Sequence, residues 1–231
     1  MKTKSVRHWM PLGVLLCVIA FSGTAQAGPP LLCRPFEIGG APSLPWNGPA
    51  WRDVRPDYDI NRLVDDTMAL LTPRTPVLAR METLRRATVY AAWSLVDSKT
   101  GYSARDPKIA RELISRLERR AAEAKGKGGD TEALALFDVG YLAESYKQAS
   151  VNAGIDGLAS VVKAIGLGGN SAEMEFAAAV ITIESRNASQ RDHLRKAVAG
   201  AADGSLLARN LVLHFSELGK SISELRTHLS R

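Results

Sequence analysis

The sequence contains little cysteine: Cys17 and Cys33 are the two examples among 231 residues. Cys17 belongs to an apolar leader, so a processed chain would retain Cys33 alone. A single cysteine cannot form a disulfide within the chain, and packing must therefore stabilise the fold in an oxidising compartment. No Cys or His residues recur at the short spacings typical of zinc ligands, so we expect no metal and no cofactor.

Long hydrophobic runs are also lacking. The one candidate covers residues 10–21, about 12 residues, whereas a membrane-spanning helix needs about 20. It follows three basic residues and ends in a small-residue cleavage pattern, comprising Lys2, Lys4, Arg7 and Ala25-Gln26-Ala27. This three-part pattern predicts a signal peptide over residues 1–27 and a periplasmic or secreted mature protein without a membrane span.

No long block of one charge is present. The formal charge is +6, and removal of the three basic leader residues leaves +3. The remaining basic residues alternate with acidic ones, as in residues 116–120, which is typical of solvated helix faces. The sequence therefore does not favour a nucleic-acid partner.

Alternating β-strand patterns are nearly absent, and helical periodicity continues from residue 58 to the C-terminus. Helix starts are predicted where a capping residue precedes an apolar stripe, and two of these starts have proline at the first helical position. The predicted starts are Asp59, Thr75, Asp106, Asp130 or Thr131, Asp156, Ser171, Ser189, Ser205 and Ser221.

Residues 28–57 differ from the rest because they contain seven prolines, at 29, 30, 35, 42, 45, 49 and 56. Proline removes an amide donor and restricts the preceding residue, so we expect no helix and no central strand here. The segment is nevertheless apolar, which predicts an extended arm lying on the helices that begin at Asp59 and Thr75. The side chains expected to pack there are Leu32, Phe36, Ile38, Leu44 and Trp46.

Two helical segments carry a large ring three residues before a small residue: Phe137 with Gly140, and Phe176 with Ala179. In addition, Lys163-Ala164 recurs 33 residues later as Lys196-Ala197. Over about residues 105–230 this pattern resembles the tetratricopeptide repeat, whose helical hairpins recur at about 34 residues. The stretch 162–173 resembles the end of one repeat, its turn and the start of the next.

The resemblance implies an all-α fold of stacked helical hairpins over residues 58–231, with a compact helical bundle as the alternative. It also implies a concave face that binds peptides and carries no chemistry of its own. A third possibility is that this face is filled by the chain's own arm.

Cys33 is the sharpest candidate for enzymatic chemistry. A thiol nucleophile needs a base or a positive field, and sequence places Arg34 beside it but no histidine. Its apolar neighbours favour a small buried side chain, with pairing between chains or redox reactivity as alternatives.

Carboxylate pairs offer a second, glycan-directed chemistry, through Glu173 with Glu175 or Glu82 with Glu37. Glu82 also precedes Arg86 by four residues, which is the spacing of an ordinary helix ion pair. Asp138 lies between apolar neighbours, and if its side chain points inward it must find a donor.

We therefore expect an exported binding or scaffold module without catalytic activity, with a protein or peptide partner. The alternative is a periplasmic enzyme that uses Cys33 or acts on cell-wall glycan. The aromatic residues Trp46, Trp51, Tyr58, Trp93 and Tyr102 could line a groove, although core packing is the simpler interpretation of each. The residues chosen as candidate binding residues are Cys33, Trp46, Asp138, Tyr141 and Tyr146.

Overall fold

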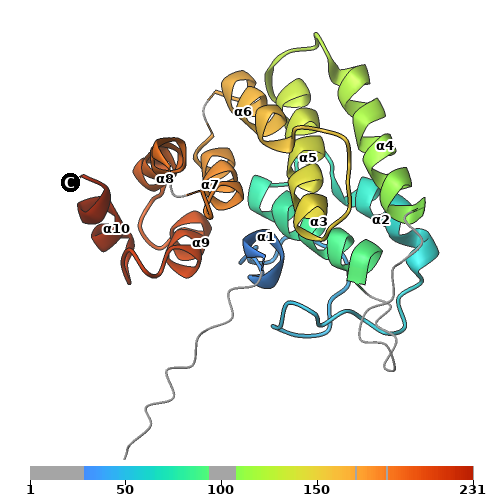
Figure 1. Ribbon diagram of the computed structural model, residues 1–231, viewed down its shortest axis with the longest axis horizontal. Coiled ribbons are helices and arrows are strands. Elements are labelled where there is room, and N and C mark those ends of the chain that lie inside the picture. The colour runs from blue at the N-terminus through green and yellow to red at the C-terminus, as the bar shows by residue number, and fades with distance from the viewer. Residues whose placement is uncertain (1–28, 94–107, 170, 186, 231) are drawn as a thin grey trace, which may run out of the picture.

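The computed structural model describes residues 29–93, 108–169, 171–185 and 187–230, and within them every regular element is helical (Figure 1). The predicted leader, Asp106, Tyr102 and the side chain of Trp93 lie outside the described part. The elements are α1 (Pro30–Cys33), η1 (Ile60–Arg62), α2 (Leu63–Leu70), α3 (Val77–Trp93), α4 (Lys108–Ala124), α5 (Gly129–Gln148), α6 (Gly157–Leu167), α7 (Ala172–Ile181), α8 (Ala188–Gly200), α9 (Leu206–His214) and α10 (Ile222–Leu229).

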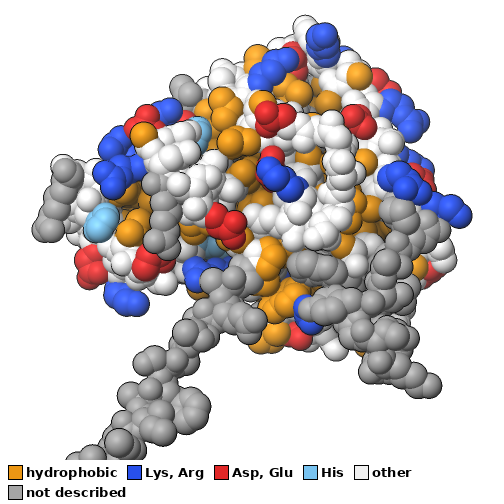
Figure 2. Space-filling view, in the orientation of Figure 1, with side chains coloured by type: hydrophobic (Ala, Val, Ile, Leu, Met, Phe, Trp, Pro, Cys, Tyr) orange, Lys and Arg blue, Asp and Glu red, His pale blue; other side chains and the backbone are white. Residues whose placement is uncertain are grey.

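Successive helices pack against one another along the chain, from α4 on α5 through to α7 on α8. Helix α3 lies at the centre and contacts α1, α2, α4, α5 and α7. Figure 1 shows α1, in blue, between α3 and the orange and red helices α7 and α9. The face in Figure 2 carries basic and acidic side chains interspersed over its surface.

Five of the nine predicted starts have the expected capping residue, and Asp59 at η1 is one of them. The side chains of Asp156, Ser171, Ser205 and Ser221 each accept a hydrogen bond from a first-turn amide of α6, α7, α9 or α10. Helices α5 and α8 are exceptions. Helix α5 begins at Gly129, before the predicted Asp130 or Thr131, and its N-cap residue is Gly128. The cap of α8 is Asn187 and not Ser189, two residues later. Asparagine is as good a cap as serine, and the more N-terminal of the two caps the helix.

The prediction that the arm contains no helix is wrong at its start. Residues 30–33 form the one-turn helix α1, with Pro30 in its first turn. Proline is tolerated there because the first amides of a helix have no partner within it. Pro35 follows closely, so the turn does not continue and the arm becomes extended.

Helices α5 and α6 pack backbone to backbone at Gly140 and Gly157. A Cβ atom at position 140 would lie 2.5 Å from the carbonyl oxygen of Gly157 and 2.9 Å from the Cβ of Ser160. Real Cβ atoms do not approach so closely, so this crossing requires glycine. The small residue three positions after Phe137 therefore does allow two helices to approach.

We expect Gly140→Ala to lower the free energy of unfolding by about 1–3 kcal/mol, because the new methyl group overpacks the α5–α6 contact. Gly166→Ala is the matched control, since position 166 lies on the exposed side of α6 and an added Cβ there would have no atom within 4 Å. This control should raise stability by up to about 1 kcal/mol. Urea denaturation of both variants measures the difference, and equal effects would contradict the close-contact interpretation.

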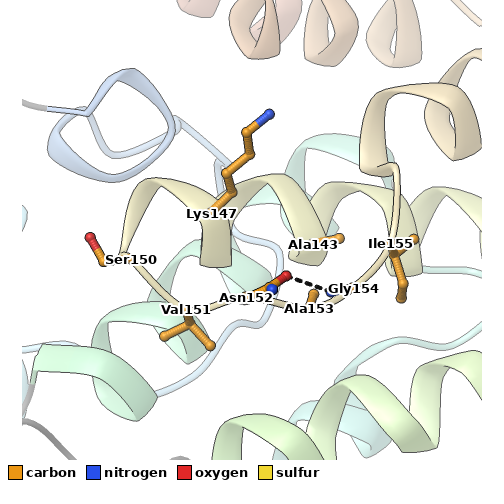
Figure 3. A pocket seen from close by; sticks show the side chains of 8 residues that line it. All are labelled: Ala143, Lys147, Ser150, Val151, Asn152, Ala153, Gly154 and Ile155. Carbon is orange, nitrogen blue, oxygen red and sulfur yellow. Dashed lines mark hydrogen bonds between the residues drawn. The ribbon is translucent and has the colours of Figure 1, made fainter.

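Helix α5 ends in a tight turn at Ser150, whose φ of 61° lies in the left-handed region. The amide of Val151 donates to the carbonyl of Tyr146, the bond that closes a Schellman cap. Ser150 and the following loop line the depression in Figure 3, where the side chain of Asn152 accepts a hydrogen bond from the amide of Gly154. Serine carries backbone strain at a position that favours glycine.

We expect Ser150→Gly to stabilise the protein by about 1 kcal/mol, because glycine adopts a left-handed φ without steric cost. Ser189→Gly, on the exposed face of α8, should be destabilising by a similar amount. Thermal unfolding of the two variants should shift in opposite directions. A loss of stability in both would argue against strain at Ser150.

Candidate functional site

The arm lies across four alternate helices, and Phe36 is the residue where they meet. Its ring stacks on His214 of α9, with centroids 4.7 Å apart, and contacts Tyr141 of α5 and Phe176 of α7 edge-on at 6.4 and 6.0 Å. Its amide donates to Glu82 of α3. Phe36 is 4% exposed, so the arm fills the surface between these helices.

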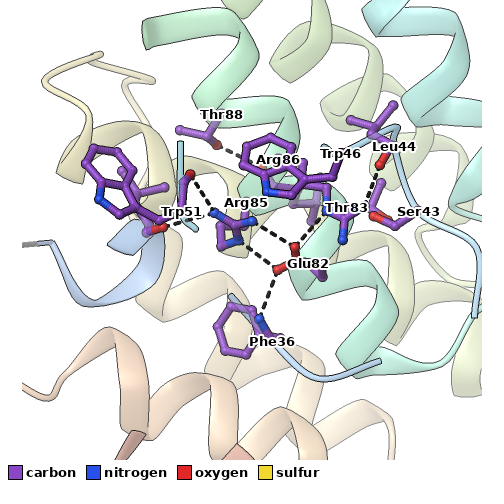
Figure 4. Close-up of polar contacts among 12 residues, drawn as sticks. Phe36, Ser43, Leu44, Trp46, Trp51, Glu82, Thr83, Arg85, Arg86 and Thr88 are labelled. Carbon is purple, nitrogen blue, oxygen red and sulfur yellow. Dashed lines mark hydrogen bonds and ion pairs between the residues drawn. The ribbon is translucent and has the colours of Figure 1, made fainter. Parts of the chain in front are cut away.

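Helix α3 holds the arm through a buried cluster of one carboxylate and two guanidinium groups (Figure 4). Glu82 is fully buried and accepts hydrogen bonds from Arg85 Nε and Nη2, at 2.7 and 2.8 Å, and from Arg86 Nε at 2.7 Å. Its Oε2 atom also accepts the amide of Phe36 at 3.0 Å. One carboxylate thus offsets part of the charge of two arginines, and the cluster retains an excess of positive charge.

That excess charge faces carbonyl groups of the arm. Arg85, which is also fully buried, donates through Nη1 to the carbonyls of Leu32 and Trp51, at 3.1 and 3.2 Å. Arg86 donates to the carbonyl of Leu44. Both guanidinium groups lie over the ring of Trp46, at 4.8 and 5.5 Å, an arrangement that stabilises a cation.

Helix α9 holds the next residue of the arm by its main chain. Asn210 accepts the amide of Glu37 at 2.9 Å and donates to its carbonyl at 2.8 Å, so one side-chain amide satisfies both groups of one peptide residue. The carboxylate of Glu37 pairs with Arg209 Nε at 2.7 Å. Arg34 donates to the last carbonyls of α9, where a positive charge also favours the helix dipole.

The packing predicted for the arm is therefore confirmed for three side chains and partial for two. Leu32, Phe36 and Leu44 are buried, whereas Ile38 and Trp46 are half-buried against the core. Of the two helices predicted to receive the arm, those beginning at Asp59 and Thr75, the second does so as α3. The contacts with α5, α7 and α9 were not predicted.

Two buried side chains beside Phe36 have polar atoms without a hydrogen-bond partner among the described residues: the hydroxyl of Tyr141 and both ring nitrogens of His214. Burial, together with the charges of Arg34 and Arg85, lowers the pKa of His214 to about 3. Burial and the nearby Glu82 carboxylate raise the pKa of Tyr141. Both side chains are consequently neutral at physiological pH.

Cys33 lies at the end of α1 as a half-buried free thiol. Burial raises its pKa, and the charges of Arg52 and Arg85 oppose that shift. A nucleophilic cysteine needs the opposite, a pKa lowered toward neutrality. This environment therefore favours a structural thiol.

Asp138 is fully buried, and its two partners lie on α3 and α4. Its Oδ2 atom accepts hydrogen bonds from Arg80 Nη1, at 2.6 Å, and from Arg120. Burial raises the pKa of Asp138, and the two guanidinium groups oppose the shift. The two arginines also donate to the carbonyls of Thr72, Thr75 and Leu71, so this cluster fixes the loop between α2 and α3.

The remaining candidate residues, Tyr146 and the carboxylates, do not form one site. Tyr146 is fully buried on α5, and its hydroxyl has no partner among the described residues. Glu82 pairs with Arg85 and Arg86, and Glu37 pairs with Arg209. Glu175 is buried and pairs with His193 Nδ1 at 2.5 Å and with Lys196 Nζ at 3.3 Å. Three of the four carboxylates proposed for glycan chemistry, Glu82, Glu37 and Glu175, thus have structural partners. Burial raises the pKa of the fourth, Glu173.

Cys33, Trp46 and Tyr141 are the predicted residues that belong to the arm or the surface beneath it. Sequence reasoning missed Arg85, Asn210 and His214, which complete that surface. The signal for Arg85 was faint: it lies between Leu84 and Arg86 on a helix whose apolar stripe leaves it on a polar face. Nothing local in the sequence links residues 210 and 214 to an arm more than 170 residues away.

The chain matches no protein-family model, and neither the curated proteins nor the solved structures contain a significant match to it. Within the described ranges, His, Cys, Asp and Glu side chains form no group of three that could hold a metal ion. No described helix is both long and apolar enough to cross a membrane.

We expect the protein to lose stability as the pH falls below about 6.5, because the unfolded chain protonates His214 before the folded chain does. Between about pH 7.5 and pH 5.5 this group should account for a loss of about 1.4 kcal/mol. His214→Phe retains a ring but removes the titrating group. Between these two pH values the variant should therefore lose about 1.4 kcal/mol less stability than the unsubstituted protein does. Denaturant titrations at both pH values measure the effect.

The control is His228→Asn, a change on the exposed side of α10. It should retain the pH dependence of the unsubstituted protein. If His214→Phe retained that dependence too, the imidazole would have to be accessible to protons in the folded state.

Proposed function

We propose that this chain is an exported helical binding or scaffold module without catalytic activity, whose inner face is built to hold an extended peptide. One observation carries the proposal: Phe36, in an extended segment, is met by α3, α5, α7 and α9 at once. Every second helix thus contributes to one surface. In the structure, the segment held on this surface is the arm of the same chain.

We further propose that the helices stack in a tetratricopeptide-like manner. The support is that neighbours in sequence are neighbours in space, from α4 to α8, while the odd-numbered helices face the arm. Arrays of stacked helical hairpins expose one such inner face, and they commonly use it for extended peptides. The close approach of α5 and α6 at Gly140 and Gly157 is the kind of contact that a hairpin needs.

The contacts to the arm support peptide binding for a second reason, because many of them involve the main chain. Asn210 pairs with both backbone groups of Glu37, while Glu82 accepts one arm amide and Arg85 and Arg86 bind arm carbonyls. Recognition of this type secures an extended strand, and a few side-chain pockets then supply specificity.

The surroundings of the potential catalytic groups support a non-catalytic role. The thiol of Cys33 has a raised pKa, and Glu82, Glu37 and Glu175 are paired with basic side chains. For any of these four groups to act as a catalyst, it would have to be free to exchange a proton or attack a substrate. Cys33→Ser should therefore leave the fold and peptide binding unchanged.

We expect the amides of Phe36 and Glu37 to exchange with solvent far more slowly than those of exposed Gly39 and Gly40, because their acceptors lie on α3 and α9. Asn210→Ala should accelerate exchange of the Glu37 amide about tenfold, because the variant loses one hydrogen bond that contributes about 1.4 kcal/mol. Hydrogen exchange read by nuclear magnetic resonance tests this at each residue.

Asn152→Ala, in the exposed loop after α5, is the matched control and should leave the exchange of both amides unchanged. Fast exchange at Phe36 and Glu37 in the unsubstituted protein would mean that the arm is not held, and the proposed function would be wrong.

A further inference from the structure

We propose that the surface beneath the arm also binds a segment of a partner protein in trans, and that it selects an extended segment with an aromatic residue followed by an acidic one. This inference rests on the proposed function and names the chemistry of the partner. In this arrangement the arm is a tethered occupant that the partner segment displaces.

Preference for an aromatic residue follows from the walls around Phe36. Tyr141, Phe176 and His214 surround its ring with one stacked and two edge-on contacts. Aromatic pairs in these geometries add about 0.5–1.5 kcal/mol each beyond their buried area. An aliphatic side chain would forgo these contacts, so the pocket discriminates by ring chemistry.

The preference for a following acidic residue comes from Arg209. Its Nε atom lies 2.7 Å from Glu37 Oε2, and both side chains are about half exposed, at 49% each. An exposed pair contributes little affinity. The position of this residue is nevertheless fixed, because Asn210 binds both of its backbone groups. An acidic side chain at this position therefore lies beside Arg209, whereas a basic side chain would be repelled.

The arm's main chain is hydrogen-bonded to Glu82 and Asn210, but the side chain of Phe36 leaves polar groups of its pocket unpaired, and this incomplete fit favours replacement. The hydroxyl of Tyr141 and both nitrogens of His214 are buried around Phe36 without a partner among the described residues. Buried polar groups left in this state weaken the complex that buries them. Arm residues on either side of the anchor, including Arg34, Gly39, Gly40 and Pro42, are exposed.

Tethering determines how the inference must be tested. A short flexible tether gives the arm an effective concentration of about millimolar, so a free peptide competes poorly against it. The arm must therefore be weakened, or its tether cut, before binding in trans can be measured.

The first experiment uses the mature chain, residues 28–231, with Phe36→Ala, and a fluorescent synthetic peptide of residues 31–47 in which Cys33 is replaced by serine. We expect saturable binding by fluorescence anisotropy, at least about tenfold tighter than to the unsubstituted chain. A peptide with Phe36→Ala should bind about tenfold more weakly, and one with Glu37→Lys severalfold more weakly. Adding Asn210→Ala to the receiving chain should weaken binding, whereas adding Asn152→Ala should not.

A second preparation guards against misfolding of the Phe36→Ala chain. A protease site placed in the exposed loop 48–50 allows the tether to be cut after folding, without altering Phe36, Glu82 or Asn210. The labelled peptide should then replace the released arm fragment. No exchange at about a hundredfold excess of peptide, together with no binding to the Phe36→Ala chain, would overturn the inference.

Failure of the inference can be told apart from failure of the proposed function. Suppose that the amides of Phe36 and Glu37 are protected from exchange but no peptide binds in trans. The module would then hold only its own arm, and the inference of a partner segment would be wrong. If the unsubstituted chain instead formed a dimer with exchanged arms, seen as a doubled mass by light scattering, the occupant would be a second copy and the partner segment would again be wrong.

Discussion

The buried pair of Glu82 and Arg85 is the constraint on which this structure depends. Both side chains are fully withdrawn from water, and removing one partner of such a pair costs about 3–5 kcal/mol. Glu82 cannot satisfy every donor of Arg85, and the carbonyls of Leu32 and Trp51 complete the set. The central helix therefore carries buried hydrogen-bond donors that the carbonyls of the folded arm satisfy, and core and arm stabilise each other.

The same arm affects how cooperatively the helical array unfolds. Helices that contact mainly their sequence neighbours can separate one pair at a time. Phe36 and Glu37 connect α3, α5, α7 and α9 across sequence separations of up to 178 residues. Opening any of these helices exposes polar groups in the others. We infer that the array unfolds more cooperatively than a chain of independent hairpins would.

Local rules predicted the helical part of the fold because helix starts depend on a few adjacent residues: Asp156, Ser171, Ser205 and Ser221 cap helices where the sequence places them. The apolar character of the arm predicted its burial for a similar reason. What could not be predicted depends on partners distant in sequence. Arg85 and Asn210 are ordinary surface residues by local pattern, and they become buried ligands of the arm through contacts 53 and 173 residues away.

The separation between Glu37 and Asn210 also has a consequence for biosynthesis. The arm is made before the helices that hold it, and α9, which completes the pocket for Phe36, is made after α3, α5 and α7. Tight packing around the anchor must therefore wait until α9 has been made. Under the proposed export, such late completion would keep the chain from packing tightly before it crosses the membrane. The order of the elements along the chain would then delay folding until export is complete.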